Sequence, residues 1–187
     1  MQDMQIWIVI GVAAAAVVYV IAAFNRLVSL RYRVRDAWAQ IDVQLKRRHD
    51  LIPNLVNAVK GYMDHERQTL EGVTRARQQA MDAAPDVNSR AAAEAALTVA
   101  TGKFMALVEA YPALRASENM LSLQEELNST ENRIAFARQF YNDSVMEYNT
   151  ARGTFPRNLV AGPFGFRAAD MFAMDDPGER AVPQIKI

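Results

Sequence analysis

The chain contains no cysteine, only two histidines, and few of the glycines and prolines that interrupt helices. The lack of cysteine excludes thiol catalysis, disulfide bonds and cysteine-based metal sites. The formal net charge is zero, which argues against a general nucleic-acid binder, because such proteins normally carry a strong basic excess. P-loop, GxGxxG and GxSxG motifs are also absent. The sequence therefore predicts a protein that is not an enzyme, with no catalytic residues and no cofactor.

Neither histidine has the neighbours that a metal site needs. His65 is flanked by Asp64 and Glu66, and His49 is followed by Asp50. Adjacent residues on a helix point about 100° apart, so such pairs cannot chelate one ion together. We predict no metal site, and we interpret both imidazoles as lying on a helix surface or at the edge of an apolar stripe.

One long apolar run stands near the N-terminus. The 19 residues from Ile6 to Phe24 carry no charge, and as a helix they would be roughly 28 Å long, close to the ~30 Å hydrocarbon core of a bilayer. A removable signal peptide would need a basic segment before a shorter run and a small-residue cleavage site after it. Residues 1–5 are not basic, and Asn25 and Arg26 follow the run. The pattern predicts a permanent transmembrane helix.

The charges beside this run indicate its orientation. Asp3 is the only charged side chain before it, whereas four arginines follow closely: Arg26, Arg31, Arg33 and Arg35. An excess of basic residues marks the cytoplasmic side, so we expect a single-pass protein of the cell (inner) membrane with its N-terminus outside and its C-terminal domain in the cytoplasm. These arginines are also candidate contacts for anionic lipid, each worth about 1 kcal/mol. The alternative is that they only fix the topology.

The soluble part shows helical periodicity throughout. No turn cluster interrupts the sequence from Asn25 to Ala84, where apolar residues recur at steps of four and three: Val34, Trp38, Ile41, Leu45, His49, Ile52, Val56, Val59 and Met63, extended by Leu70 and Val73. Pro53 lies within this stripe, and Asp50 could cap a restarted helix. The segment is either one kinked helix or two helices that meet near residues 50–53.

Two further helices are expected. A turn at residues 82–89 precedes a helix to about Tyr111, and Pro112 marks another break. The last helix begins at Ser122, which forms a capping box with Glu125, or one turn earlier at Ser117, and it ends at Gly153. No run has the alternation of a strand. We predict an all-α fold: a transmembrane helix continuing into an antiparallel bundle of three to four long helices (25–155), followed by an irregular tail (156–187) whose phenylalanines dock in part.

Charged and aromatic residues suggest how the bundle packs and what it could bind. The basic cluster Lys46, Arg47 and Arg48 has an acidic counterpart on the last long helix: Glu125, Glu126, Glu131 and Asp143. Aromatic residues at helical spacing are expected in the core: Trp38, Tyr62, Phe104, Tyr111, Phe136, Phe140, Tyr141 and Tyr148. Polar residues without an obvious packing role form the candidate partner surface: Asp42, Gln44, Lys46, Arg47, Arg48 and Asn54. Gly11 and Ala15 would permit self-association of the span.

These segments closely resemble the LemA family of bacterial membrane proteins. The matching runs cover almost the whole chain: 25–30, DAWAQIDVQLKRRHDLIPNLV (36–56), VKGY (59–62), HE (65–66), VTRAR (73–77), AYP (110–112), ASEN (116–119), LQEEL (123–127), TENRI (130–134), ARQFYND (137–143), YN (148–149) and FP (155–156). The tail departs from the family, which often has paired phenylalanines where this chain has Met171 and Phe172.

The resemblance implies a single-pass inner-membrane protein with a helical bundle and no established enzymatic activity, cofactor or catalytic residues. Magnetosome-associated relatives belong to the family, and its genes often lie beside those of TPM-domain proteins or membrane zinc metalloproteases. We therefore expect a membrane-anchored scaffold or adaptor in envelope or membrane organisation, which contacts lipid and either a partner membrane protein or further copies of itself. The alternative is a membrane-linked sensor or regulator whose bundle rearranges at Pro53 and Pro112 on binding a ligand or partner.

Overall fold

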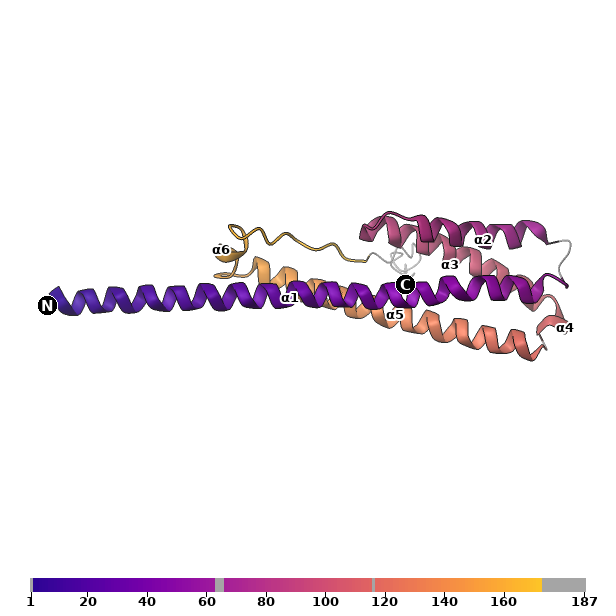
Figure 1. The fold of residues 1–187 in the computed structure, drawn as a ribbon, viewed down its shortest axis with the longest axis horizontal. Helices are drawn as coiled ribbons and strands as arrows, with labels where there is room; N and C mark the ends of the chain where they lie inside the picture. Colours follow the sequence, from indigo (N-terminus) through magenta and orange to yellow (C-terminus); the bar gives the residue numbers. More distant parts are fainter. Residues whose placement is uncertain (1, 63–65, 116, 173–187) are drawn as a thin grey trace, which may run out of the picture. The chain divides into compact units, whose positions relative to one another are not determined.

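A computed structural model describes residues 2–62, 66–115 and 117–172, and this part of the chain is helical and contains no strand. The elements in chain order are α1 (Gln2–Val59), α2 (Arg67–Asp82), α3 (Val87–Glu109), α4 (Pro112–Arg115), α5 (Glu118–Gly153) and α6 (Asn158–Ala161) (Figure 1). The predicted all-α fold is confirmed.

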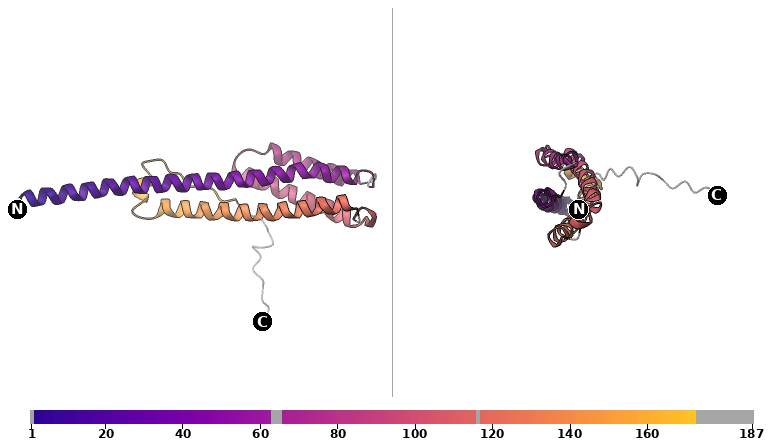
Figure 2. Two further views of the ribbon diagram at one scale, coloured as in Figure 1. Left: turned by 60° about the horizontal axis from the view of Figure 1, so that its bottom comes forward. Right: turned by 90° about the vertical axis from the view of Figure 1, so that its right-hand side faces the viewer.

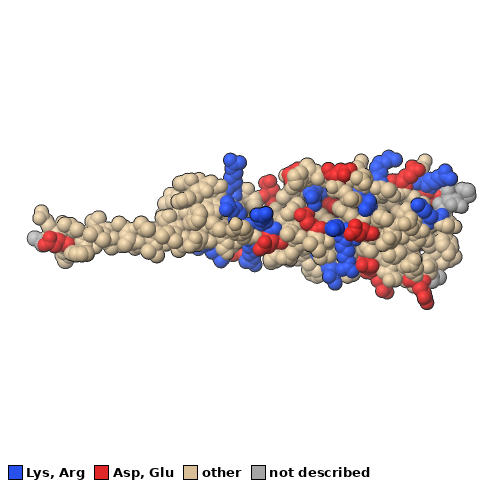
Figure 3. Space-filling view, in the orientation of Figure 1, with Lys and Arg blue, Asp and Glu red and all other residues tan. Residues whose placement is uncertain are grey.

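The first helix is long and unbroken. α1 passes through Pro53 without ending, so at this position one helix is correct, and not two helices that meet near residues 50–53. Its side chains are exposed from Gln2 to Ala22, and Ala23 is the first that is buried. The apolar part of α1 has a mean hydropathy of 2.6, and Figure 3 shows it almost wholly tan, with charge only at its tip. By length and composition it can cross a bilayer.

α3 also passes this test of length and composition, with a mean hydropathy of 1.3. It differs from the N-terminal part of α1 because it buries one face, including Leu97, Phe104 and the charged Glu94. We interpret α3 as a core helix.

A break after Val59 corrects the prediction of an uninterrupted helical segment from Asn25 to Ala84. α1 ends there, the amide of Tyr62 donates to the Val59 carbonyl at 2.9 Å, and α2 begins at Arg67. The apolar spacing continues across the break to Leu70 and Val73, and for this reason the sequence pattern did not reveal the break. Gly61 is the one nearby residue that indicates a turn. Met63 and His65 lie outside the described residues.

The other helix ends follow from capping residues. The turn expected at residues 82–89 is present, and the Asp86 carboxylate caps α3 by accepting the Ser89 amide at 2.8 Å. α5 begins at Glu118, so the earlier of the two predicted starts, at Ser117, is correct. The capping box at Ser122 is wrong, because this residue lies inside the helix. α5 ends at Gly153 as predicted.

The chain divides into two compact units, and the boundary falls within α1 and within α5. The stem unit comprises Met1–Asp42 and Phe136–Met171. The second unit comprises Val43–Ala135 and Phe172–Ile187, and we call it the four-helix unit after its long helices α1, α2, α3 and α5, to which the short α4 is added. Residues 25–155, expected to form one bundle, are therefore distributed over both units. Each unit is described by itself.

In the stem unit, α1 and α5 lie side by side and antiparallel (Figure 2). Arg26 pairs with Glu147, whereas Trp38, further along α1, stacks edge-to-face on Tyr141, with ring centroids 5.3 Å apart. The buried side chains recur at helical spacing on both helices: Leu27, Leu30, Val34, Ala37 and Ile41 on α1, and Ala137, Tyr141, Val145, Tyr148 and Ala151 on α5.

In the four-helix unit, the predicted stripes meet in a common core. Its buried residues are Ile52, Leu55, Val56, Val59, Val73, Ala76, Ala80, Leu97, Phe104, Val108, Leu114, Met120 and Leu127. Two predictions about aromatic residues in the core fail. Tyr62 of this unit is 56% exposed, and Phe136 of the stem unit is 72% exposed.

The described part of the tail is packed in part, as expected: Phe166 and Phe172 are buried, whereas Phe164 is exposed. Tyr141 and Tyr148 of α5 donate their hydroxyls to the Asp170 and Arg167 carbonyls, each at 2.8 Å. The Asn149 side chain donates to the Ala169 carbonyl at 2.9 Å and accepts the Ala169 amide at 3.0 Å. The tail residues beyond Phe172, with Pro177 and Pro183, lie outside the described residues.

Candidate functional site

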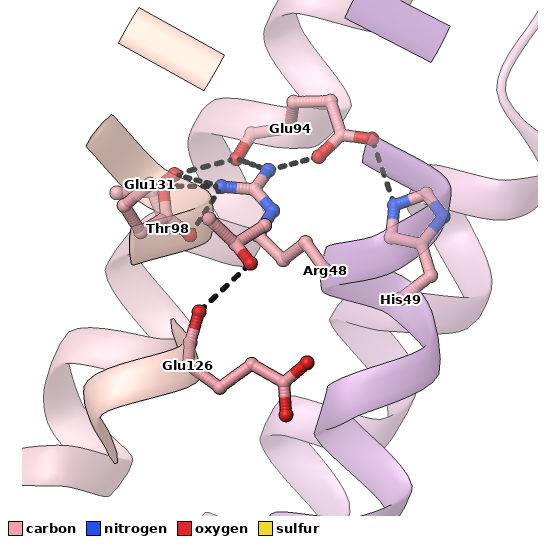
Figure 4. A network of polar contacts seen from close by, with 7 residues as sticks. Arg48, His49, Glu94, Thr98, Glu126 and Glu131 are labelled. Atoms are coloured by element: carbon pink, nitrogen blue, oxygen red, sulfur yellow. Dashed lines mark hydrogen bonds and ion pairs between the residues drawn. The ribbon is translucent and has the colours of Figure 1, made fainter. Parts of the chain in front are cut away.

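A cluster of charged side chains lies inside the four-helix unit, centred on Arg48 of α1 (Figure 4). The Arg48 side chain is fully buried. Four helices contribute to the cluster: α1 with Arg48 and His49, α2 with Arg77, α3 with Glu94 and Thr98, and α5 with Glu131. A buried guanidinium cannot lose its proton, so its charge must be balanced where it lies.

Two carboxylates balance the charge of Arg48. Its Nη2 donates to Oε2 of Glu94, whose side chain is also fully buried. Its Nη1 donates to both carboxylate oxygens of Glu131, at 3.0 and 3.1 Å, and to Oγ1 of Thr98 at 3.1 Å. Charge-assisted hydrogen bonds of this kind are about twice as strong as neutral ones. They fix the positions of α3 and α5 against α1 within this unit.

Glu94 also binds the neighbouring residue of α1. Its Oε1 lies 2.8 Å from Nε2 of His49, so the carboxylate sits between an imidazole and a guanidinium, as Figure 4 shows. Burial by itself raises the pKa of the Glu94 carboxyl. The hydrogen bond to His49 and the charge of Arg48 together outweigh burial, and the pKa lies below its ordinary value. Glu94 is therefore a carboxylate at neutral pH.

Pro53 explains the contact between α2 and this region. Proline has no amide hydrogen, so the carbonyl four residues earlier, that of His49, loses its helical donor. Nε of Arg77 donates to this carbonyl at 2.6 Å. A side chain of α2 thus replaces the hydrogen bond that the proline removes, which is how α1 continues through residue 53.

An exposed ion pair beside the cluster provides a comparison. Nη2 of Arg47 lies 2.8 Å from Oε1 of Glu126, but both side chains are about 40% exposed. Solvent screens such pairs, and they contribute at most ~1 kcal/mol. The expectation that the basic cluster of α1 faces acidic residues of α5 is confirmed for Glu126 and Glu131.

The structure corrects one member of the predicted partner surface. The Arg48 side chain is fully buried inside the unit, so it cannot contact a partner. Lys46, Arg47 and Asn54 are exposed, whereas Asp42 and Gln44 are partly buried.

The four arginines after the apolar run are all exposed, and three of them contact protein groups of the stem unit. Arg26 and Arg33 pair with the same carboxylate, that of Glu147, at 2.7 and 2.8 Å. The guanidinium carbon of Arg31 lies 5.2 Å from the ring centroid of Phe166. Arg35 is exposed. Contact of these arginines with lipid stays a prediction.

Sequence reasoning missed Glu94, Thr98 and Arg77. One signal could have identified Glu94, because it lies three residues before Leu97 and extends the stripe of α3 backwards. A lone carboxylate on an apolar stripe calls for a buried basic partner, and Arg48 follows the same logic. Arg77 carries no such signal, since its partner is a backbone carbonyl.

The chemistry of the cluster is that of a structural tie. All of its strong contacts join an arginine or a histidine to carboxylates, a hydroxyl or a carbonyl. Among the described residues, no group of three or more histidines and carboxylates could hold a metal ion.

The helical architecture and its motifs agree with a comparison against known families. The LemA family model matches residues 37–187, which is most of the chain. The chain belongs to the LemA family. Protein LemA of Metamycoplasma hominis is 26% identical over 137 residues, covering 73% of this chain and 63% of that protein.

Magnetosome proteins are also similar. Magnetosome protein MamQ of Magnetospirillum gryphiswaldense and Magnetosome protein MamQ 1 of Paramagnetospirillum magneticum are each 32% identical over 88 residues, or 46% of this chain. The match spans only about a third of these magnetosome proteins, 32% of their length.

The buried and exposed ion pairs should respond differently to neutralisation. Glu94→Gln leaves the buried charge of Arg48 short of one counter-charge, and we expect a loss of about 3 kcal/mol in the free energy of unfolding. The matched variant Glu126→Gln, in the exposed pair, should lose less than ~1 kcal/mol. Urea unfolding of the full chain in detergent micelles, followed by circular dichroism, measures both.

The pH dependence of the unfolding free energy, compared between the parent and Glu94→Gln, tests the same assignment. Because the folded pKa of Glu94 is depressed, its stabilisation is present above the unfolded pKa of about 4.3 and is lost as pH falls through the folded pKa. The parent should therefore lose more stability than Glu94→Gln over this acidic window. Equal losses in Glu94→Gln and Glu126→Gln at neutral pH would contradict the assigned roles.

The replacement of a helical hydrogen bond by Arg77 predicts coupling with Pro53. Arg77→Ala should cost about 1–2 kcal/mol, because the His49 carbonyl is left without a donor. In a Pro53→Ala background the new amide at residue 53 can donate to that carbonyl, so the same substitution should cost less. A double-mutant cycle of unfolding free energies measures the difference, and additive effects would refute the exchange of donors.

Proposed function

We propose that this protein is a non-enzymatic scaffold, tethered to the cytoplasmic membrane by the N-terminal part of α1 and acting in membrane or envelope organisation. The observation that carries the proposal is the continuity of α1. A charge-free, exposed stretch long enough to cross a bilayer runs without a break into a helix that is packed in both units. The proposed membrane-spanning helix thus continues as the helix that contributes buried residues to both units.

The charge distribution supports an orientation with the packed units in the cytoplasm. Four exposed arginines follow the apolar stretch within about three turns of α1, and a basic excess at one end of a span marks its cytoplasmic side. The magnetosome relatives are named for an organelle structure, and they support a role at a membrane.

The scaffold surface that we propose is the exposed face of α1 in the four-helix unit. It consists of Val43, Lys46, Arg47, Asp50 and Asn54, which recur at steps of three and four and are all exposed. Val43 is 63% exposed and adds an apolar side chain at one end of this charged face. The surface suits a second copy of the chain or a partner membrane protein, such as a TPM-domain protein or a membrane metalloprotease.

Single cysteines test the tether and its orientation, because the chain has none of its own. In spheroplasts of a bacterial host, Gln2→Cys should react with a membrane-impermeant maleimide, whereas Asn54→Cys should react only after lysis. Both residues are exposed, and the cysteine-free parent is the control. The reverse pattern would refute the orientation, and release of the chain by a carbonate wash would refute the tether.

Photo-crosslinking tests the scaffold surface. A photoreactive amino acid at Asn54 should give a discrete adduct in native membranes, with mass spectrometry distinguishing a second copy from another protein. Lys46→Glu should weaken this adduct, because it reverses a charge on the same face. Gln79, an exposed residue of α2, is the matched control position and should give no adduct. Equal adducts from Asn54 and Gln79 would contradict the assignment.

A membrane-linked sensor is the second candidate, and one observation favours it. The His49 carbonyl is held by a side chain of α2 in place of a backbone amide, so α1 and α2 can separate there without losing a helical hydrogen bond. The double-mutant cycle at Pro53 and Arg77 tests this structural premise.

A further inference from the structure

Three large apolar side chains are exposed within the eleven residues that follow the end of α5. Phe155 is 73% exposed, Leu159 65% and Phe164 55%. Leu159 lies in α6 and the two phenylalanines on either side of it, whereas the α6 residues Val160 and Ala161 are buried within the stem unit. Exposed apolar side chains that are so close together in the sequence mark a site of contact with a membrane or with another protein.

The position of this segment beside α1 favours contact with a membrane. The ring of Phe24, the last residue of the charge-free stretch, lies edge-to-face against Phe164 and Phe166, with centroids 5.2 and 5.6 Å apart. Figures 1 and 2 show α6 beside α1, further toward the N-terminus of α1 than the end of α5. The segment therefore lies where the apolar stretch of α1 meets its first arginine.

The C-terminal end of the segment is held in place. The amides of Gly165 and Phe166 donate to the Gly162 and Ala161 carbonyls, each at 3.0 Å, and Gly165 closes this turn with a φ of 70°. Beyond it, the hydroxyl of Tyr148 donates to the Arg167 carbonyl at 2.8 Å. The exposed side chains are thus presented by an ordered backbone, which lowers the entropy cost of burying them.

The charges around the segment are mainly basic, although Glu147, which pairs with Arg26 and Arg33, lies beside them. Residues 148–169 include Arg152, Arg157 and Arg167 but no aspartate or glutamate. Arg26 and Arg31 follow Phe24 on α1, and Arg31 lies over the ring of Phe166. In Figure 3 blue atoms gather, with some red ones, where the tan N-terminal part of α1 ends. Apolar side chains with a basic border match an anionic bilayer surface.

We propose that residues 155–166 form an interfacial membrane anchor, which inserts Phe155, Leu159 and Phe164 among the acyl chains of the leaflet from which α1 emerges. The inference rests on the proposed tether by α1. The span and the anchor contact the same leaflet, and the arginines lie at the level of anionic headgroups. The stem unit is thereby held to the membrane at two points, so it cannot tilt freely about the end of the span.

Depth-dependent fluorescence quenching tests the anchor in the full chain. Single cysteines at Leu159, Phe136 and Val17 carry an environment-sensitive dye, and the proteins are reconstituted into vesicles of neutral and anionic phospholipid. Phe136 is the matched control, because it is an equally exposed apolar residue of the stem unit, 72% against 65%, but lies about 26 Å before the end of α5. Circular dichroism of each labelled protein checks that it is folded.

The dye at Leu159 should be quenched by nitroxide lipids labelled near the headgroup and protected from aqueous iodide. The dye at Val17 should be quenched by lipids labelled deep in the acyl chain, and the dye at Phe136 by iodide alone. Quenching of Leu159 by iodide as strong as at Phe136 would overturn the anchor. Protection from iodide without lipid quenching would also overturn it, because the occupant would then be a second copy. If Val17 escapes lipid quenching, the tether itself fails.

Discussion

The buried charge of Arg48 is the constraint on which the four-helix unit depends. A guanidinium in the interior must meet counter-charges, and these come from Glu94 of α3 and Glu131 of α5. An apolar core tolerates small shifts of one helix along another, because a leucine can pack in several ways. A guanidinium that donates to carboxylates on two other helices does not tolerate them, since its hydrogen bonds require both distance and direction. The cluster therefore selects one register among those that the apolar stripes would allow.

The same cluster includes the side chain that compensates for the helical hydrogen bond lost at Pro53. Pro53 removes a helical hydrogen bond from His49, and the side chain of this residue is meanwhile engaged by Glu94. Arg77 supplies the missing donor from another helix. A proline that would kink an isolated helix is thus accommodated in the packed unit, and the connection of α2 to α1 is specific at this point.

The helices were predictable from the sequence because each buries a stripe with a regular period. The stripe from Val34 to Val59 is found along α1, and Gly153 ends α5 where its capping role predicts. The break after Val59 was not predicted, because apolar spacing continues into α2 and hides the turn. Spacing reports which face is buried, but it does not report whether the chain between two apolar residues is straight.

The charged site was predictable only in part. Opposite charges on α1 and α5 indicated that these helices face each other, but not that Arg48 is inside while Arg47 is outside. Adjacent residues of a helix differ by about 100° in direction, and only the packing of a third helix decides which of them is enclosed. Glu94 is that deciding partner, and it is separated from Arg48 by a turn, a helix and a second turn.

The contact between Phe24 and Phe164 has a consequence for the order of events during synthesis. The partner of Phe24 is translated about 140 residues later, which at ~5–20 residues per second is a delay on the order of ten seconds. The apolar part of α1 leaves the ribosome long before Phe164, whose ring packs against Phe24, has been translated. The contact that covers Phe24 can therefore form only after about 140 further residues have been added.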